Sequence, residues 1–385
     1  MKRRLRLGMI GGGQGAFIGA VHRIASRIDD HYELVAGVFS STTEKSKLSS
    51  DELRVDPSRS YSNYEEMAEK ESQREDKIDV VAIVTPNHLH YGPAVSFLRK
   101  DFHVICDKPL TLNLDEAKSL VEVVESSKGI FALTHNYTGY PMVRQARAMI
   151  RNNELGKIRI IQAEYVQDWL TTNIESKEGA DGFKQASWRT DPKKSGAGGC
   201  IGDIGTHAFN LISFTTGLEI KELSAELTSF VSGRVLDDNV QVMLRYKGGA
   251  KGSIWSSQVA PGNENGLTIR IYGEKGGLSW GQENPNHLIF SQQGKPNTTL
   301  TRSGPGTHQD ATDVSRIPAG HPEGYLEGFA NIYSDVATAI WEKNETGKLS
   351  SNYIFPNVYD GLSGVKFIEK AVKSSQENSK WIPFN

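Results

Sequence analysis

The first third of the chain alternates between short apolar runs and stretches with helical periodicity. The apolar runs predict strands, and the continuous run at 79–85 is typical of a parallel strand covered on both faces. Strands are expected at 5–10, 33–39, 79–85, 102–106 and 130–134, and helices at 18–28, 62–75, 88–100 and 113–127. Alternating strands and helices indicate a parallel sheet built from βαβ units.

Beyond about residue 150, strand-like runs follow one another and are joined by turns such as Lys247-Gly248-Gly249. Strands are expected at 158–167, 220–231, 240–246, 252–259, 267–272 and 277–280, and helices at 203–215, 324–342 and 358–374. The polar segment 284–322 is expected to be a loop. We therefore predict an α/β chain with a parallel-sheet domain over 1–138. A second domain over 139–385 carries a large, mostly antiparallel open sheet, and its last helices can pack back on the first domain.

Composition excludes several classes of protein. A chain of 385 residues suits two domains or one large one. With 44 Lys+Arg against 46 Asp+Glu, no field of one sign exists to recruit nucleic acid or an anionic membrane. The basic N-terminus resembles a signal peptide, but Gly11–Gly15 interrupts the apolar patch, so we expect a cytoplasmic protein. Cys106 and Cys200 are expected to be reduced and buried.

The first predicted strand runs directly into Gly11-Gly12-Gly13-Gln14-Gly15, and a predicted helix follows. Such a turn lets the backbone approach a pyrophosphate, which rests on the helix N-terminus. The pattern is irregular, because Ala16 occupies the third glycine position and Gly19 lies three residues further on. We predict a Rossmann domain that binds NAD or NADP; a turn without a ligand is the alternative. The expected contacts are Gly11, Gly13, Gln14, Gly15, Ala16 and Phe17.

The end of the second strand bears on the choice of cofactor. An acid there would hold the 2′-hydroxyl of NAD, but Ser40 and Ser41 follow the strand instead. These hydroxyls and Lys45 could hold a 2′-phosphate, which slightly favours NADP. Alternatively, Lys45 is merely solvated.

Three further motifs follow in order: Thr85-Pro86-Asn87-His88-Leu89-His90, Asp107-Lys108-Pro109 and Gly202-Asp203-Ile204-Gly205-Thr206-His207. With the glycine turn, they resemble the glucose–fructose oxidoreductase / inositol dehydrogenase (Gfo/Idh/MocA) family over essentially the whole chain. The resemblance implies an NAD(P)-dependent enzyme acting on a sugar or inositol, assembled as a homo-dimer or homo-tetramer.

The resemblance also implies roles for single residues. Lys108 would contact the substrate hydroxyl and the nicotinamide ribose, His207 would be the acid/base, and Asp203 would assist it. The residues expected beside the nicotinamide half of the cofactor are Thr85, Pro86, Asn87, His90, Asp107, Lys108 and Asn136. The chain departs from the family pattern at Asp107 (usually Glu), at Asn210 (often Asp), and at Tyr137-Thr138, which replace an arginine pair.

The residues also suit this chemistry by themselves. On a helix, Asp203 and His207 share a face, and a histidine titrates near neutral pH. Lys108, at the carboxyl end of a parallel strand, would stabilise an alkoxide as hydride leaves. The alternatives are a surface lysine and a helix salt bridge. His88 and His90 point different ways on a helix, so no metal site is expected.

Substrate contacts are expected from polar and aromatic residues near these motifs. Trp188 with Arg189 suits a sugar or polyol ring, although packing and a salt bridge explain them too. Asp168 and His321 are further candidates, as are Lys108, Asp203 and His207. Few basic residues lie nearby, which favours an unphosphorylated substrate.

The prediction is therefore an NAD(P)-dependent oxidoreductase that takes hydride from a CH–OH group of a sugar, sugar derivative or inositol. One alternative is a glycoside hydrolase of the same fold that oxidises its substrate transiently. The other is an NAD(P)-binding sensor without catalysis.

Overall fold

A computed structural model describes residues 2–350 and 353–385. By its internal contacts the chain divides into two compact units. Unit 1 comprises Met1–Asn136 and Leu326–Leu362, and unit 2 comprises Tyr137–Tyr325 and Ser363–Asn385. The sequence places one boundary near residue 138, whereas this division also gives a late segment of the chain to unit 1.

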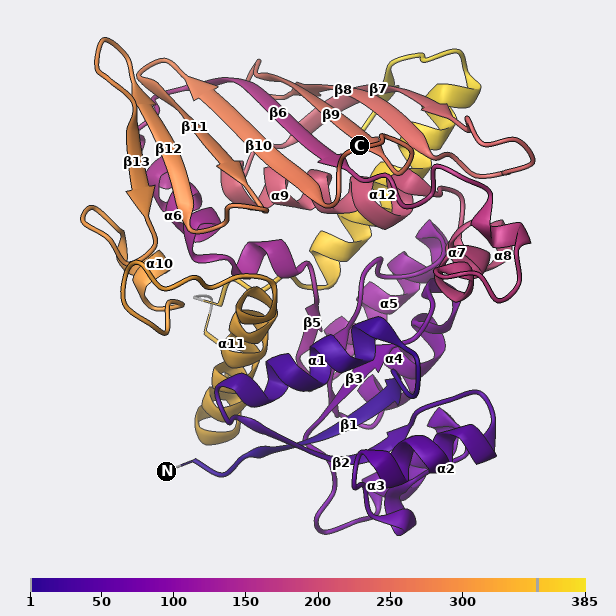
Figure 1. Cartoon of the computed structure of the whole chain (residues 1–385). Coiled ribbons are helices and arrows are strands. Elements are labelled where there is room, and N and C mark those ends of the chain that lie inside the picture. Colours follow the sequence, from indigo (N-terminus) through magenta and orange to yellow (C-terminus); the bar gives the residue numbers. More distant parts are fainter. Residues whose placement is uncertain (1, 351–352) are drawn as a thin grey trace. The chain divides into compact units, whose positions relative to one another are not determined.

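Unit 1 is built on a five-stranded parallel sheet in the order β2-β1-β3-β4-β5 (Figure 1). Its strands are β1 (Leu5–Gly11), β2 (Tyr32–Val38), β3 (Val80–Val84), β4 (His103–Cys106) and β5 (Phe131–Leu133). All residues of β3 are buried, as its continuous apolar run predicts. The Rossmann-type arrangement is thereby confirmed.

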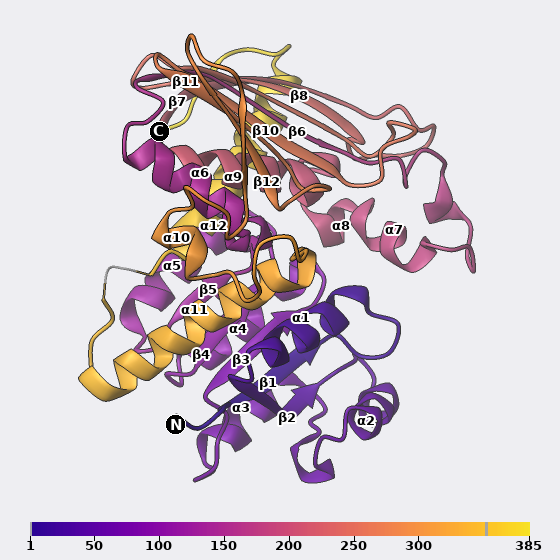
Figure 2. The ribbon, with the colours of Figure 1, turned by 60° about the vertical axis from the view of Figure 1, so that its left-hand side comes forward.

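Most helices of unit 1 lie where the helical periodicity of the sequence predicts them. They are α1 (Phe17–Ile28), α2 (Thr43–Glu52), α3 (Tyr64–Ser72), α4 (Tyr91–Leu98), α5 (Leu114–Ser126) and most of α11 (Tyr325–Thr346). Asn113 caps α5, because its side chain accepts a hydrogen bond from the backbone N–H of Glu116. Helices α1 and α11 lie side by side (Figure 2), and Tyr333 of α11 is joined to His22 of α1 by a 2.8 Å hydrogen bond.

Unit 2 is built on a nine-stranded sheet in the order β13-β12-β11-β10-β6-β9-β8-β7-β14. Only the pair β6–β9 is parallel among the described strands of this sheet. The strands are β6 (Ile158–Val166), β7 (Ile220–Thr228), β8 (Asn239–Tyr246), β9 (Lys251–Ser257), β10 (Gly266–Gly273), β11 (Gly276–Gly281), β12 (His287–Gln292), β13 (Thr298–Thr301) and β14 (Ile382–Pro383). The predicted open, mostly antiparallel sheet is confirmed.

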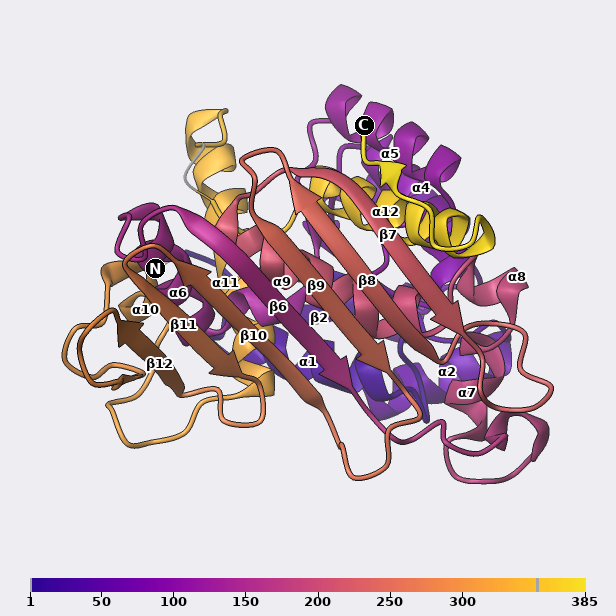
Figure 3. The same ribbon diagram turned by 90° about the horizontal axis from the view of Figure 1, so that it is seen from above.

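One face of this sheet carries the core of unit 2. In β6 the alternate residues Ile161, Ala163 and Tyr165 are buried, and helices cover them (Figure 3). These helices are α6 (Pro141–Arg151), α9 (Thr206–Thr216) and the part of α12 (Val358–Gln376) that follows Leu362. The opposite face keeps apolar side chains exposed, among them Ile160, Met243, Tyr272 and Ile289.

The expectation of a loop over 284–322 is wrong. This segment contains β12, β13 and the short helix α10 (Gln309–Thr312). Strands that are covered on one face require few apolar residues, and in β12 Leu288 is buried while its neighbour Ile289 is exposed. The remainder is fastened by the buried Arg302, whose guanidinium donates to the carbonyls of Ile317 and Pro318 at 2.7 and 3.0 Å.

Among the described residues, no helix is long and apolar enough to cross a membrane.

Candidate functional site

The glycine turn after β1 has a backbone that other residues rarely adopt. Gly11, Gly12 and Gly15 have φ values of +82°, +73° and +70°. Gly13 allows close packing instead, because a Cβ atom there would lie 2.5 Å from the carbonyl oxygen of Phe39. The turn therefore forms a compact backbone cradle at the carboxyl end of β1, in which the Gly13 N–H donates to the Phe39 carbonyl oxygen at 3.1 Å.

Gly19 performs the packing role that the sequence motif assigns to a third glycine. A Cβ atom on Gly19 would lie 2.3 Å from the Cα atom of Gly12. Helix α1 can therefore approach the turn closely although Ala16 occupies the usual position.

The first turn of α1 faces this cradle without a side-chain cap. Ala16 is the N-cap residue and makes no side-chain hydrogen bond to the helix, and Phe17 is 65% exposed. Free N–H groups at a helix start favour an anion. The cradle and the uncapped helix together fit the pyrophosphate of a dinucleotide.

Beyond β2, the chain forms helix α2, which the sequence did not predict. Ser40 and Ser41 lie before it, and Lys45 is exposed on its first turns. The turn and α2 are joined by Gln14, whose side chain donates to Glu52 at 2.5 Å. The Glu52 carboxylate thus lies beside the glycine turn, and the exposed Lys45 and Lys47 lie on the same helix.

The motif Thr85–His90 follows β3 and is tied to the motif that follows β4. The buried His90 ring lies 2.9 Å from the Thr85 carbonyl oxygen and 2.7 Å from that of Pro109. Burial lowers the pKa of His90. The His90 ring therefore lies between a carbonyl oxygen of each motif, and Pro86 and the buried Asn87 precede it along the chain.

Asp107 and Lys108 extend from the end of β4. One Asp107 carboxylate oxygen accepts hydrogen bonds from the Lys108 backbone N–H at 2.8 Å and from the Thr134 hydroxyl at 2.9 Å. The Lys108 side chain is half-buried. The carboxylate thus fixes the backbone from which the lysine extends.

Sequence reasoning missed His135, which follows β5 and precedes the buried Asn136. Burial and, second, the charge of Lys108 lower the pKa of His135 to about 3. A neutral imidazole therefore lies near the lysine. Its position after a parallel strand was the signal that could have identified it.

In unit 2, Asp203 lies in a π-helical turn, η5 (Ile201–Gly205), and His207 lies in the first turn of α9. The prediction of one regular helix over 203–215 is therefore wrong at its start. Asp237 shapes this turn, since its carboxylate accepts from the N–H groups of Gly199 and Ile201 at 2.7 and 2.8 Å. π-Turns occur frequently at functional sites.

The Asp203 carboxylate is held by two donors. Its Oδ2 atom accepts from Arg189 Nε at 3.1 Å and from Gln258 Nε2 at 2.9 Å. His207 is 7% exposed, and its ring centroid lies 4.9 Å from that of Tyr137. The sequence identified the acid and the histidine but not these supports.

The residues predicted to contact the substrate lie in different segments of unit 2 and have different partners. Arg189, on α7 (Phe183–Arg189), stacks 4.2 Å above the Trp188 ring while it bonds Asp203. Asp168 accepts from the Gly262 N–H at 3.2 Å, and the exposed His321 lies in the segment that Arg302 fastens. Of these four predicted substrate contacts, the contacts described connect Arg189 directly to Asp203, and Trp188 through its stacking on Arg189.

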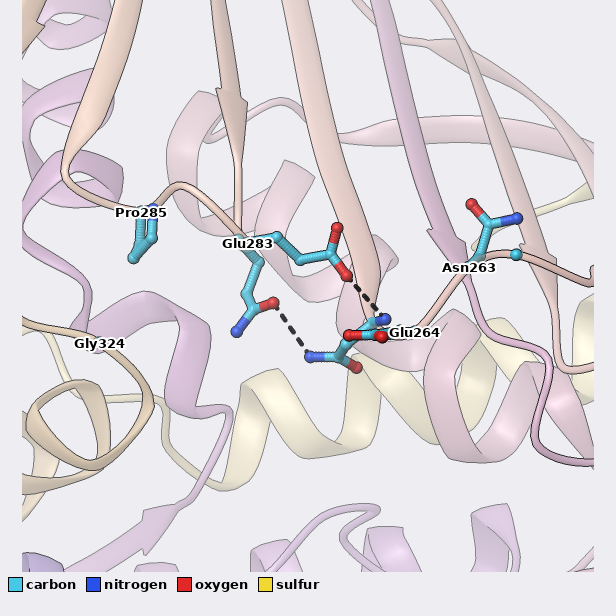
Figure 4. Close-up of a pocket in the computed structure, with 8 residues that line it drawn as sticks. Asn263, Glu264, Glu283, Pro285 and Gly324 are labelled. Atoms are coloured by element: carbon cyan, nitrogen blue, oxygen red, sulfur yellow. Dashed lines mark hydrogen bonds between the residues drawn. The ribbon is translucent and has the colours of Figure 1, made fainter.

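A hollow of about 650 Å³ opens in unit 2, with Glu264 and Glu283 on its wall (Figure 4). The full lining is Gly262, Asn263, Glu264, Asn265, Gln282, Glu283, Pro285 and Gly324. Its uncharged amides and two carboxylates suit a ligand that carries hydroxyl groups.

Over residues 2–350 and 353–385, no group of three or more His, Cys, Asp or Glu side chains is placed to hold a metal ion. Cys106 and Cys200 are free and buried, and burial raises the pKa of both thiols.

Comparison with known proteins covers both units. Residues 5–135 match the NAD-binding Rossmann fold of an oxidoreductase family, GFO_IDH_MocA, and residues 143–279 match the GFO/IDH/MocA C-terminal domain. The uncharacterized oxidoreductase YfiI of Bacillus subtilis is 35% identical, over 100% of this chain and 98% of its own length.

Two of the solved structures that resemble this chain match it over almost its whole length. An oxidoreductase from Sinorhizobium meliloti is 53% identical with a TM-score of 0.89, covering 99% of this chain and 100% of that one. An inositol dehydrogenase homolog from Azotobacter vinelandii, complexed with NADH and myo-inositol, is 34% identical with a TM-score of 0.93. That match covers 100% of this chain and 98% of the homolog.

Proposed function

Because the chain belongs to the GFO/IDH/MocA family of oxidoreductases, we propose that it oxidises a CH–OH group of an inositol or another neutral polyol or sugar, with NAD as the hydride acceptor. One observation carries the proposal. The glycine turn, Thr85 and Lys108 follow β1, β3 and β4, which are neighbours in the sheet. The carboxyl ends of adjacent parallel strands meet at one edge, where such folds bind dinucleotides.

The bound nicotinamide would accept the hydride, and the chain would supply the rest. Lys108 holds the substrate oxygen and stabilises its developing negative charge. His207 removes the hydroxyl proton, and Asp203 supports the imidazolium that forms. Arg189 and Gln258 keep the Asp203 carboxylate in place.

We assign NAD rather than the NADP that the sequence slightly favoured. The homolog described above holds NADH. In addition, the Glu52 carboxylate of α2 is hydrogen-bonded to Gln14 of the glycine turn and brings negative charge to that side of the expected cofactor. Repulsion from this carboxylate disfavours an extra phosphate.

We also propose that copies of the chain associate through the exposed face of the nine-stranded sheet. Ile160 and Tyr272 are paired neighbours on that face and are 49% and 42% exposed. An apolar patch of this kind is typical of a subunit interface. Light scattering should give a dimer or tetramer; a monomer at micromolar concentration would contradict this.

The activity is tested with inositols, aldoses, anhydrosugars and glycosides, each with NAD and NADP. The proposal predicts reduced nicotinamide with at least one neutral substrate, and a loss of about a hundredfold or more in kcat for Lys108→Ala. Lys247→Ala, at an exposed turn of unit 2, is the control and should remain active. No reduction across the panel, although NAD binds, would contradict the proposal.

A further inference from the structure

A chain of hydrogen bonds runs beside His207 in unit 2. The hydroxyl oxygens of Tyr137 and Tyr165 lie 2.5 Å apart. Tyr165 then donates to Asn265 Oδ1 at 2.8 Å. Both tyrosines are buried, and Asn265, which immediately precedes β10, is half-buried.

The direction of these hydrogen bonds is fixed at one end by Trp169, whose indole N–H can only donate. The indole donates to Gln167 Oε1 at 3.1 Å, which identifies that atom as the amide oxygen. Gln167 Nε2 is therefore the amide nitrogen, and it donates to Asn265 Oδ1 at 2.8 Å. Asn265 Oδ1 is therefore an acceptor, and Tyr165 gives its proton to it. Tyr137 must then donate its own proton to Tyr165.

The hydrogen bonds of the Asn265 amide nitrogen are consistent with this direction. Its Nδ2 atom donates to Gln282 Oε1 at 3.0 Å, and Gln282 Nε2 donates to the Tyr140 hydroxyl at 3.3 Å. The Asn265 backbone N–H donates to Glu283 at 2.9 Å, on the wall of the hollow (Figure 4). Contacts on both sides thus hold the Asn265 side chain in one orientation.

At its tyrosine end, this series of hydrogen bonds lies against the imidazole of His207 through ring contacts. The Tyr137 ring lies nearly perpendicular to that of His207, at 77°, with centroids 4.9 Å apart. The Tyr165 ring lies 6.0 Å away on a tilted plane. Two tyrosine rings, each held by its hydroxyl group, therefore lie against the His207 ring and limit the rotation of the imidazole.

We propose that Asn265, acting through Tyr165 and Tyr137, is a positioning residue that fixes the orientation of the His207 imidazole for proton removal. This inference rests on the proposed role of His207 as the base. A base must lie within hydrogen-bond reach of the proton that it takes, and a small misplacement is costly.

The test compares Tyr165→Phe and Asn265→Leu with Tyr246→Phe. Tyr246 is also buried in unit 2, but its hydroxyl has no hydrogen-bond partner among the described residues. Tyr165→Phe and Asn265→Leu should each lower kcat about ten- to a hundredfold with KM nearly unchanged. Tyr246→Phe should retain the wild-type kcat. Asn265→Asp keeps the accepting oxygen and should retain more activity than Asn265→Leu.

A double-mutant cycle separates positioning from general damage. In a His207→Ala background, Tyr165→Phe should cause no further loss. Equal losses in both backgrounds, or a Tyr165→Phe variant as active as Tyr246→Phe while His207→Ala is impaired, would overturn the positioning role alone. Wild-type kcat in His207→Ala would overturn both this role and the proposed function of His207.

Discussion

Arg189 donates a 3.1 Å hydrogen bond to Asp203 while its guanidinium stacks on the ring of Trp188. It also donates to the side chain of Gln185 at 2.6 Å. The guanidinium thus forms the salt bridge that the sequence offered as the alternative to a substrate contact. We propose that it holds the Asp203 carboxylate in place.

Replacing Arg189 should therefore reduce turnover more than substrate binding. We expect Arg189→Ala to lower kcat about tenfold or more, and Arg189→Lys to restore part of it, because lysine keeps the charge but not the planar stacking. Arg159→Ala, which removes an exposed ion pair with Glu274, is the control. A raised KM with unchanged kcat would instead indicate a direct substrate contact.

The close approach of Gly12 and Gly19 predicts a structural cost for any larger residue. Gly19→Ala should lower the free energy of unfolding by about 1–3 kcal/mol and weaken NAD binding, because α1 must move away from the turn. Gly248→Ala, where an added Cβ meets nothing within 4 Å, should change neither. Calorimetry and NAD titration measure both effects; a neutral Gly19→Ala would refute the packing argument.

Asp237 should make stability depend on pH. Burial raises its pKa to about 6, above the usual value near 4, so the folded state binds this proton more tightly than the unfolded state. Its contribution is therefore full below about pH 4 and is lost as pH rises through 6, by about 3 kcal/mol at most.

This loss is measured as the difference in unfolding free energy between the wild type and Asp237→Asn, which should fall between pH 4 and 7. A constant difference for Asp237→Asn would show that its carboxyl does not titrate as described.

The Glu52 carboxylate beside the glycine turn predicts a preference for NAD. We expect kcat/KM to be at least about tenfold higher with NAD than with NADP, and Lys45→Ala to leave the NAD value unchanged. Steady-state kinetics with both cofactors decide this. A preference for NADP that disappears in Lys45→Ala would contradict the assignment.

Local patterns predicted much of the fold because β1 to β5 and the strands β6 to β11 are marked by apolar runs of their own. The strands β12 and β13, the last two at one end of the sheet, were missed, since one buried residue such as Leu288 hardly alters a polar segment. The π-turn at Asp203 was also missed. Its geometry depends on Asp237, which lies far along the chain.

The candidate site shows the same limit. Lys108, Asp203 and His207 belong to motifs and could be selected as candidates, although their roles remain proposals. The supports of His207 could not be selected, because Tyr165 and Asn265 meet only when β6 pairs with β10. A hydrogen-bond direction set by Trp169 leaves no local trace in the sequence.

The most direct test of the central claim follows the hydrogen itself. The protein is incubated with NAD and the best polyol substrate, deuterated at the reacting carbon, and the nicotinamide is analysed by mass spectrometry. The account predicts one deuterium per oxidised substrate in the released NADH, and none with His207→Ala on the same timescale. Conversion of a substrate without net NADH, with deuterium returned to the product, would contradict a dehydrogenase and indicate transient oxidation instead.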